Sequence, residues 1–382
     1  MYIANNDNSY TAKTIVTLEN ITLTGGKSTG AGGATVFIGG ELIMNSGATI
    51  DSCESTGNGG GVQVSGGTFT MNEGATISNC TGSKGGGVYV EEGVFSMSGG
   101  TIGGETERLG CTASEGGGVY VADGEFNMSG SAKIEGCKTY KHGGGVYMAS
   151  KTTFNMSGGT IDMCTVYNDQ TDVDSCGGGV YLASNTTFNM SGGIISNCEV
   201  YNSYSSRFAY GGGVYLASST FFDMSGGTIG GLEENTGCRA EQGGGVYVAA
   251  NGKFEMENGS ITGNTASSTV PHGAGVDVLG IFNMSGGSIT ENKLICEDRS
   301  NDLSCGGAGV AVEVTKNSTN PTEIDKSGAF TMTGGTISGN TIDKKDNNTY
   351  KTNVYGTGVY VVSGASFSNN GGTISDEIYP AQ

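Results

Sequence analysis

Short apolar stretches alternate with glycine along the chain, and the clearest example is residues 85–102, GGGVYVEEGVFSMSGGTI. Within it, residues 88–90 (VYV) and 95–97 (FSM) alternate their side chains as half-buried strands do. A glycine pair then leads to a third apolar position at Ile102. Three short strands with glycine at the corners predict one coil of a β-solenoid.

The same unit recurs along the sequence, as expected of a stacked array. The first valine of each unit is Val36, Val62, Val88, Val119, Val146, Val180, Val214, Val246, Val276, Val310 or Val359. A Phe-x-Met stretch and then a single Ile follow in nearly every unit. Parallel crossovers are nearly always right-handed. The pattern therefore predicts an all-β fold, a single right-handed parallel β-helix of about eleven coils with three short strands per coil and Phe, Met and Ile in its core.

This array is expected to form one domain over residues 1–382. Residues 1–30 read as an irregular N-terminal partial coil, 31–363 as regular coils and 364–382 as a C-terminal partial coil. The extra residues of the longer units fall mainly between the Ile strand and the next glycine run, at 103–115, 162–176, 196–210, 230–242, 290–305 and 338–355. One further insertion, 313–329, separates the first and second strands of its unit. Insertions at one corner predict a ridge of loops along one edge, where solenoids often bind partners.

Composition narrows the class of protein. Glycine occurs 72 times and proline 3 times, without the strict three-residue period of collagen. Acidic residues outnumber basic ones by 37 to 18, so the net charge of -19 disfavours nucleic acid and anionic membranes as partners. No apolar run approaches the roughly 18 residues needed to insert into a membrane. The first residues do not have the pattern of a secretory signal, and we expect a segment of a longer exported protein.

Tyrosine occupies the middle of the first strand in six consecutive units. These residues are Tyr89, Tyr120, Tyr147, Tyr181, Tyr215 and Tyr247. The insertions add Tyr167, Tyr201, Tyr204 and Tyr210. One interpretation is that stacked rings stabilise a flat sheet, as cross-strand pairs do. The other is that both sets form an outward strip that binds sugar rings or a partner protein.

The ten cysteines fall into two groups. Seven of them, and then three asparagines, are expected at one inward corner of successive coils as a buried ladder of free thiols and amides. These residues are Cys53, Cys80, Cys111, Cys137, Cys164, Cys198, Cys238, Asn264, Asn292 and Asn340. Each of two insertions also holds a pair, and we predict that Cys164–Cys176 and Cys296–Cys305 close the necks of these loops when oxidised. No cysteine and histidine cluster has the spacing of a zinc site.

Candidate chemistry is sparse. The sharpest acidic group is Asp169, Asp172 and Asp174, which either binds calcium or is a solvated loop; we favour the loop because the twelve-residue calcium hand with its closing Glu is missing. Otherwise no cofactor is expected. Carbohydrate-cleaving sites need paired carboxylates, and the outward middle position of the first strand holds mainly tyrosine. We therefore expect no catalytic residue.

The GGGVY runs, the Phe-x-Met-Ser/Asn stretches and the ITGNTA form at 261–266 resemble repeats of bacterial and archaeal surface adhesins. They are also similar to the GG-x-[ILV] and F-x-x-N repeats of polymorphic outer-membrane proteins of the autotransporter type, and residues 69–72 (FTMN) match the second pattern strictly. The resemblance covers nearly the whole chain. It implies a pectin-lyase-like, right-handed β-helix exported to the cell surface, and it implies no catalytic residue.

Together these features predict a non-enzymatic β-helix at the cell surface or outside the cell, a structural or adhesive segment that binds a glycan or a surface protein. One alternative is a filament subunit that joins head to tail as a homo-oligomer. A second alternative is a polysaccharide lyase or hydrolase of the β-helix type.

Overall fold

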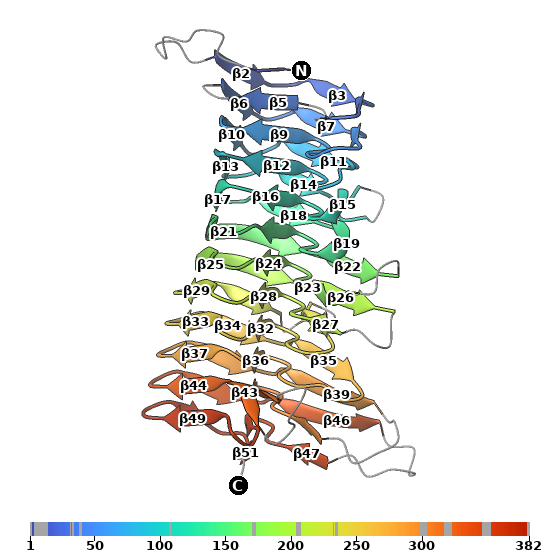
Figure 1. Cartoon of the computed structure of the whole chain (residues 1–382). Helices are drawn as coiled ribbons and strands as arrows, with labels where there is room; N and C mark the ends of the chain where they lie inside the picture. The colour runs from blue at the N-terminus through green and yellow to red at the C-terminus, as the bar shows by residue number, and fades with distance from the viewer. Residues whose placement is uncertain are drawn as a thin grey trace.

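The computed structural model describes residues 2–3, 14–30, 32, 34–37, 40–106, 109–169, 173–203, 208–231, 233, 236–297, 304–316, 323–345 and 353–379. The described chain winds through short strands that stack on one another from the N-terminal to the C-terminal end (Figure 1). Almost every pairing is parallel and joins strands of successive turns of the chain. The predicted parallel β-helix is thereby confirmed, and the chain has no helix within the described residues.

The first sheet contains the valine strands. Its thirteen strands, in order along the stack, are β1 (Tyr2–Ile3), β5 (Ala34–Phe37), β9 (Val62–Ser65), β12 (Val88–Glu91), β16 (Val119–Val121), β20 (Val146–Met148), β24 (Val180–Leu182), β28 (Val214–Leu216), β32 (Val246–Val248), β36 (Val276–Val278), β41 (Val310–Val312), β48 (Val359–Val361) and β51 (Ile378–Tyr379).

The second sheet joins the Phe-x-Met strands and the Ile strands across a glycine corner. Its 22 strands are β2 (Thr14–Leu18), β3 (Thr22–Thr24), β6 (Gly40–Met44), β7 (Thr49–Asp51), β10 (Thr68–Met71), β11 (Thr76–Ser78), β13 (Gly93–Met97), β14 (Thr101–Gly103), β17 (Gly124–Met128), β18 (Lys133–Glu135), β21 (Thr153–Asp162), β25 (Thr187–Ser196), β29 (Phe221–Met224), β30 (Thr228–Gly230), β33 (Lys253–Met256), β34 (Ser260–Thr262), β37 (Ile281–Met284), β38 (Ser288–Thr290), β44 (Ala329–Met332), β45 (Thr336–Ser338), β49 (Ser366–Asn369) and β50 (Thr373–Ile374). In β21 and β25 the two strands of a coil run through the corner as one.

A third sheet lies between the Ile strands and the glycine runs. Its ten strands are β15 (Thr112–Glu115), β19 (Lys138–His142), β22 (Thr165–Asn168), β23 (Ser175–Cys176), β26 (Glu199–Asn202), β27 (Ala209–Tyr210), β31 (Arg239–Ala240), β35 (Thr265–Ser268), β39 (Lys293–Glu297) and β46 (Thr341–Lys345). Much of the sequence that we expected to form loops therefore forms a further strand, in addition to the three predicted for each coil. The cause is local: segments such as 199–202 (EVYN) alternate buried and exposed side chains, as strands do.

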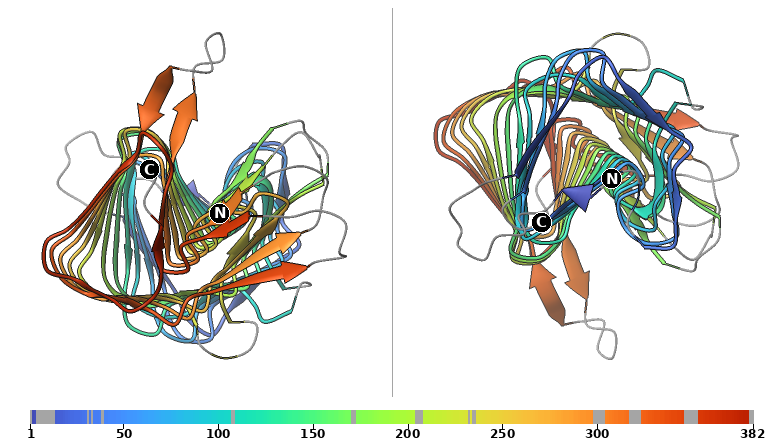
Figure 2. Two further views of the ribbon diagram at one scale, coloured as in Figure 1. Left: turned by 90° about the horizontal axis from the view of Figure 1, so that it is seen from below. Right: turned by 90° about the horizontal axis from the view of Figure 1, so that it is seen from above.

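Three two-stranded pairs complete the structure. They are β4 (Lys27–Ser28) with β8 (Glu54–Ser55), β40 (Ser304–Gly306) with β47 (Asn353–Tyr355), and the antiparallel β42 (Val314–Lys316) with β43 (Ile324–Ser327). The last pair is the 313–329 insertion, and it projects from the side of the stack in the views along the axis (Figure 2).

The register of the first unit differs from our expectation. Ala34 pairs with Val62, and Val36 pairs with Val64. The residue equivalent to Val62 is therefore Ala34, two residues earlier than predicted. The valine pattern misled because two apolar residues at alternate positions fit either register equally well.

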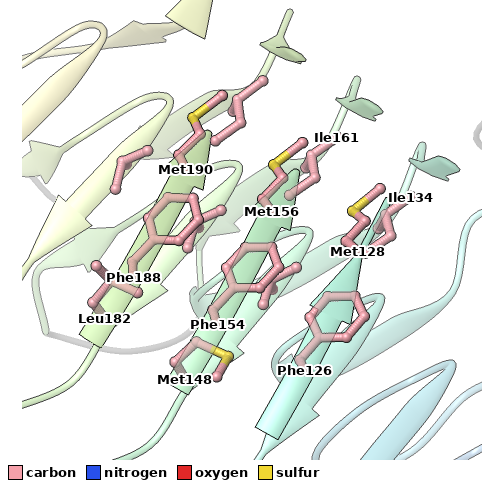
Figure 3. Close-up of a cluster of buried hydrophobic side chains, with 14 of the residues drawn as sticks. Phe126, Met128, Ile134, Met148, Phe154, Met156, Ile161, Leu182, Phe188 and Met190 are labelled. Atoms are coloured by element: carbon pink, nitrogen blue, oxygen red, sulfur yellow. The ribbon is translucent and has the colours of Figure 1, made fainter. Parts of the chain in front are cut away.

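Stacked phenylalanines form the centre of the core. The rings from Phe69 to Phe367 lie 4.6–5.0 Å apart from one coil to the next, and rows of Met and Ile run alongside them (Figure 3). Each Phe of this stack from Phe69 to Phe330 is at most 1% exposed. The predicted Phe, Met and Ile stripes are thus one continuous core along the described coils.

The glycine runs allow this core to close. Gly85 has a φ of 64°, a left-handed conformation that side chains disfavour. A Cβ added to Gly87 would lie 2.6 Å from Ile102 Cγ2 and 2.7 Å from the Gly118 carbonyl oxygen. The first glycine therefore makes the turn, and the third lets the valine strand pass close to the Ile strand and to the next coil.

Candidate functional site

The six predicted tyrosines form one ladder on the outer side of the first sheet, which we call the tyrosine ladder. Each pairs in register with the next, as Tyr147 does with Tyr181. Their ring centroids lie 4.5–5.5 Å apart in stacked geometry. The ring faces, which are the part of tyrosine that stacks on a sugar, are therefore turned toward each other.

A second row of side chains covers this ladder. Each of its members directly precedes a glycine run, and backbone pairing brings them into line: Lys84, Glu115, His142, Cys176, Tyr210, Gln242, His272, Gly306 and Tyr355. We call this the pre-glycine row, and the contact between it and the tyrosine ladder the tyrosine seam. Lys84 Nζ lies 4.9 Å from the Tyr120 ring centre and 3.2 Å from its hydroxyl oxygen. The Tyr210 ring centre lies 4.6 Å from that of Tyr247.

Burial in the seam is deep. Tyr89 and Tyr120 are 6% and 5% exposed, and the other four rings of the ladder are half-buried. Burial raises the pKa of Tyr247 well above its ordinary value. The tyrosine ladder does point away from the main core, as expected, but it lies in a second, more polar core. It is not an open strip.

His142 is a half-buried base in the seam, and its Nδ1 atom is fully buried. Its ring stacks on Tyr181 at 4.7 Å between centroids, and its Nδ1 has no hydrogen-bond partner within the described residues. Burial lowers the pKa of His142 to about 4 against the attraction of Glu115 and Asp174. The imidazole is therefore neutral at pH 7.

The tyrosine ladder is interrupted near its C-terminal end, where Asp277 follows Tyr247 and Ala311 follows Asp277. Asp277 is fully buried, and none of the described groups makes a well-aligned hydrogen bond to either carboxyl oxygen. Glu313, two residues beyond Ala311, lies with its Oε1 3.0 Å from His272 Nδ1. Burial raises the pKa of both carboxyl groups, and for Asp277 the neighbouring Glu313 charge adds to the effect.

Tyr360 fills the space that Ala311 and Gly306 leave. A Cβ on Gly306 would overlap the Tyr360 ring. The ring lies 5.8 Å from that of His272, and its hydroxyl is 3.4 Å from Ser304 Oγ. Asp277, Glu313 and His272 are therefore enclosed by aromatic rings. The sequence carries a signal for this site, since Asp277 stands at the position that tyrosine holds in the six preceding units.

Exposed aromatic residues lie on the outer side of the third sheet. Tyr167 and Tyr201 pair in register, with ring centroids 5.3 Å apart, and they are 45% and 48% exposed. Tyr140 holds the equivalent position one strand earlier, directly after Thr139, which pairs with Val166. Exposed Leu109, Val173 and Phe208 come from the same edge. Of the predicted loop tyrosines, Tyr210 belongs to the seam, and Tyr204 lies outside the described residues.

The structure describes two members of the acidic group predicted as a calcium site or a solvated loop, Asp169 and Asp174. Asp174 accepts a hydrogen bond from the Phe208 backbone N–H at 3.2 Å, and Asp169 is exposed. Asp172 lies outside the described residues. Across the part of the chain that is described, no three His, Cys, Asp or Glu side chains are grouped closely enough to hold a metal ion.

The predicted ladder of thiols and amides is present. Its seven cysteines are buried and reduced, and the column continues as Cys238 N–H donates to Asn264 Oδ1 at 2.9 Å. Asn264, Asn292 and Asn340 then join to each other at 3.0 Å. Asp376, which we had not expected, accepts from Asn340 Nδ2 at 2.9 Å and ends the described column.

The two predicted cysteine pairs differ in position. Cys164 lies in the column between Cys137 and Cys198, while Cys176 lies in the seam with its thiol hydrogen-bonded to Tyr215. The structure therefore does not bring that pair together. Cys296 and Cys305 lie together in a small separate apolar cluster, and their thiols interact with each other. All four are free thiols in the structure.

Comparison with protein-family models, with curated proteins and with solved structures gave no match to this chain. Among the described residues, no helix is long and apolar enough to span a membrane.

Proposed function

We propose that this chain is a non-enzymatic structural and adhesive β-helix, located outside the cell or at its surface as part of a longer exported protein. Support for a structural role comes from the continuous internal columns. The Phe core, the tyrosine seam and the thiol and amide column all run from coil to coil. Stacked repeats of this kind share their stability with their neighbours and suit a stiff stalk.

The single observation that carries the adhesive part is the exposed aromatic group of the third sheet. We call it the aromatic ridge: Tyr140, Tyr167 and Tyr201 on β19, β22 and β26, together with Leu109, Val173 and Phe208 just before β15, β23 and β27, each 37–48% exposed. Tyr140, Tyr167 and Tyr201 hold equivalent positions on three successive strands, and exposed aromatic side chains aligned in this way are typical of interaction surfaces. Because Tyr167 and Tyr201 stack on each other, they offer their edges and hydroxyl groups outward. This geometry favours a surface protein as partner over a glycan whose sugars stack on the ring faces.

The proposal is tested by replacing Tyr140, Tyr167 and Tyr201 together with Ser. Binding of the purified chain to immobilised surface proteins, to intact cells and to a glycan array is compared with that of the unmodified chain. The matched control replaces Ile194, Ile281 and Ile378, which are similarly exposed but lie off the ridge, with Ser.

We expect the ridge variant to lose binding while the control variant and the circular dichroism spectrum remain unchanged. Equal binding by all three proteins would reject the ridge, and binding by none of them to any target would reject adhesion. Release of a cleaved product from a polysaccharide would favour the enzyme alternative. Replacing the half-buried Tyr147, Tyr181 and Tyr215 would not be a clean test of binding, because it would also remove part of the second core.

A further inference from the structure

Asp277, Glu313 and His272 form a largely buried group, which we call the Asp277 cluster, and its geometry restricts where its protons lie. His272 Nε2 lies 3.1 Å from the Ser304 backbone carbonyl oxygen. A carbonyl only accepts, so Nε2 must carry a hydrogen. In the neutral imidazole the lone pair of Nδ1 would then face Glu313 Oε1 at 3.0 Å. Two acceptors at this distance repel each other, so His272 or Glu313 must carry a further proton, although no described group is aligned to donate a hydrogen bond to Glu313 Oε1.

Asp277 requires a second proton. Its carboxyl group is fully buried beside Glu313, without a well-aligned hydrogen bond among the described residues. An isolated buried carboxylate is strongly disfavoured and normally takes up a proton instead. The nearest favourable dipole is the Val278 backbone N–H, and burial outweighs it.

The groups that face Asp277 from neighbouring elements do not neutralise its carboxylate, so the need for this proton remains. They are Tyr247 on β32, Tyr210 on β27, and Glu313, which follows β41. Tyr360 on β48 faces Glu313. Burial raises the pKa of each of these tyrosines, so they are neutral near pH 7. His272, the base of the cluster, is the ion-pair partner of Glu313.

We propose that Asp277, Glu313 and His272 form a proton-operated clasp that holds the C-terminal part of the tyrosine seam closed and loosens when its protons are lost. Loss of the Asp277 proton would leave two carboxylates in one buried site. The coils around β36 and β41 would then open to hydrate them, while the coils around β12 and β16, which have Tyr89 and Tyr120 at this position, would not. This inference is independent of the aromatic ridge.

The sign of the effect follows from linkage. A folded-state pKa above the unfolded one means that the folded chain binds more protons, so stability decreases as pH rises from the unfolded value toward the folded one. Over that interval, the equilibrium constant for opening is expected to rise about tenfold per pH unit for one such group.

The test uses Asp277→Asn, which keeps the shape of the side chain and cannot ionise, with Asp123→Asn at an exposed position as the matched control. Opening is measured on the full chain, under reducing conditions, by alkylation of buried Cys305, which lies next to Ser304. Buried Cys80 in the N-terminal coils is the internal reference. Rates are compared between variants at each pH from 5 to 9, so that the reactivity of the thiols themselves cancels.

We expect the ratio of Cys305 to Cys80 labelling to rise with pH in the unmodified chain and in Asp123→Asn, but not in Asp277→Asn. The same pH trend in all three proteins would overturn the proposal. Infrared difference spectroscopy of the folded, unmodified chain at pH 7 provides a readout that does not depend on any variant folding. A protonated carboxyl band supports the clasp, and its absence rejects it.

Discussion

Acid should loosen the middle of the tyrosine seam through His142, and the size of the effect can be worked out from its surroundings. The imidazole stacks on Tyr181, and burial lowers its pKa from 6.5 to about 4. In the unfolded chain the same side chain is protonated below pH 6.5. The unfolded chain therefore binds more protons in this range, and stability is full above pH 6.5 and is lost as pH falls toward 4. Since one pKa unit corresponds to about 1.4 kcal/mol, the loss is about 3 kcal/mol.

The informative variant is His142→Phe, which keeps a flat ring against Tyr181 and cannot titrate. Hydrogen exchange resolved by peptide, at pH 7 and pH 4, reports the opening of β19 and β24 separately from the rest of the stack. We expect the unmodified chain to lose about 3 kcal/mol of local protection between the two pH values, and His142→Phe to lose much less. Equal losses in both proteins would refute the assignment.

A local readout is essential because the Asp277 cluster acts in the opposite direction. Between pH 4 and 6.5, protonation of unfolded His142 lowers stability as the pH falls, whereas the retained proton of Asp277 raises it. Global melting curves of the unmodified chain would report the sum of these two opposite slopes and would therefore show little change of stability with pH. Because the two groups lie on different coils of a repeat array, protection resolved by coil separates them.

Three other results are expected. Phe188→Ala removes a fully buried ring from the core stack and should cost about 3–5 kcal/mol in urea unfolding, and a loss below about 1 kcal/mol would contradict the packing. With a low-molecular-weight disulfide as oxidant, peptide mapping should find Cys296 joined to Cys305 while Cys164 remains a thiol. If Cys296 and Cys305 are both found as thiols, the predicted disulfide between them is wrong. Cys198→Ala removes a buried hydrogen-bond donor and should cost about 1–3 kcal/mol of stability, most of which Cys198→Asn should retain. Equal losses in the two variants would show that a donor is not needed at this position.

Much of this fold could be predicted because its signals are local. A strand repeats its pattern every two residues, so Phe95 and Met97 or Val88 and Val90 identify their own buried face without reference to the rest of the chain. Equivalent positions in successive units then gave the Phe core and the cysteine column. A local pattern does not fix the register where two alternating residues fit equally well, as Ala34 and Val36 do.

The candidate site was harder because it depends on how the chain folds across each coil. Alternation places Tyr147 on the outer side of the first sheet, but it does not say whether another row covers that side. The covering row was present in the sequence as the residue directly before each glycine run, such as Glu115 and Tyr210. We had treated these residues as the ends of loops, and the short alternating segments that form the third sheet were hidden for the same reason.

The cysteine column has a simpler explanation than redox chemistry. In coil after coil, the column residue donates to the carbonyl oxygen of the core Ile of the preceding coil. Cys80 Sγ lies 3.8 Å from the Ile50 oxygen, and in the later coils Asn264 Nδ2 lies 3.0 Å from that of Ile229. Thiol and amide therefore satisfy the same buried acceptor, at distances usual for sulfur and nitrogen donors. Burial raises the pKa of Cys198 well above its ordinary value, which keeps the thiol protonated and able to donate. A column selected for oxidation would have no reason to change to asparagine, whereas a column selected for a hydrogen-bond donor can use either residue.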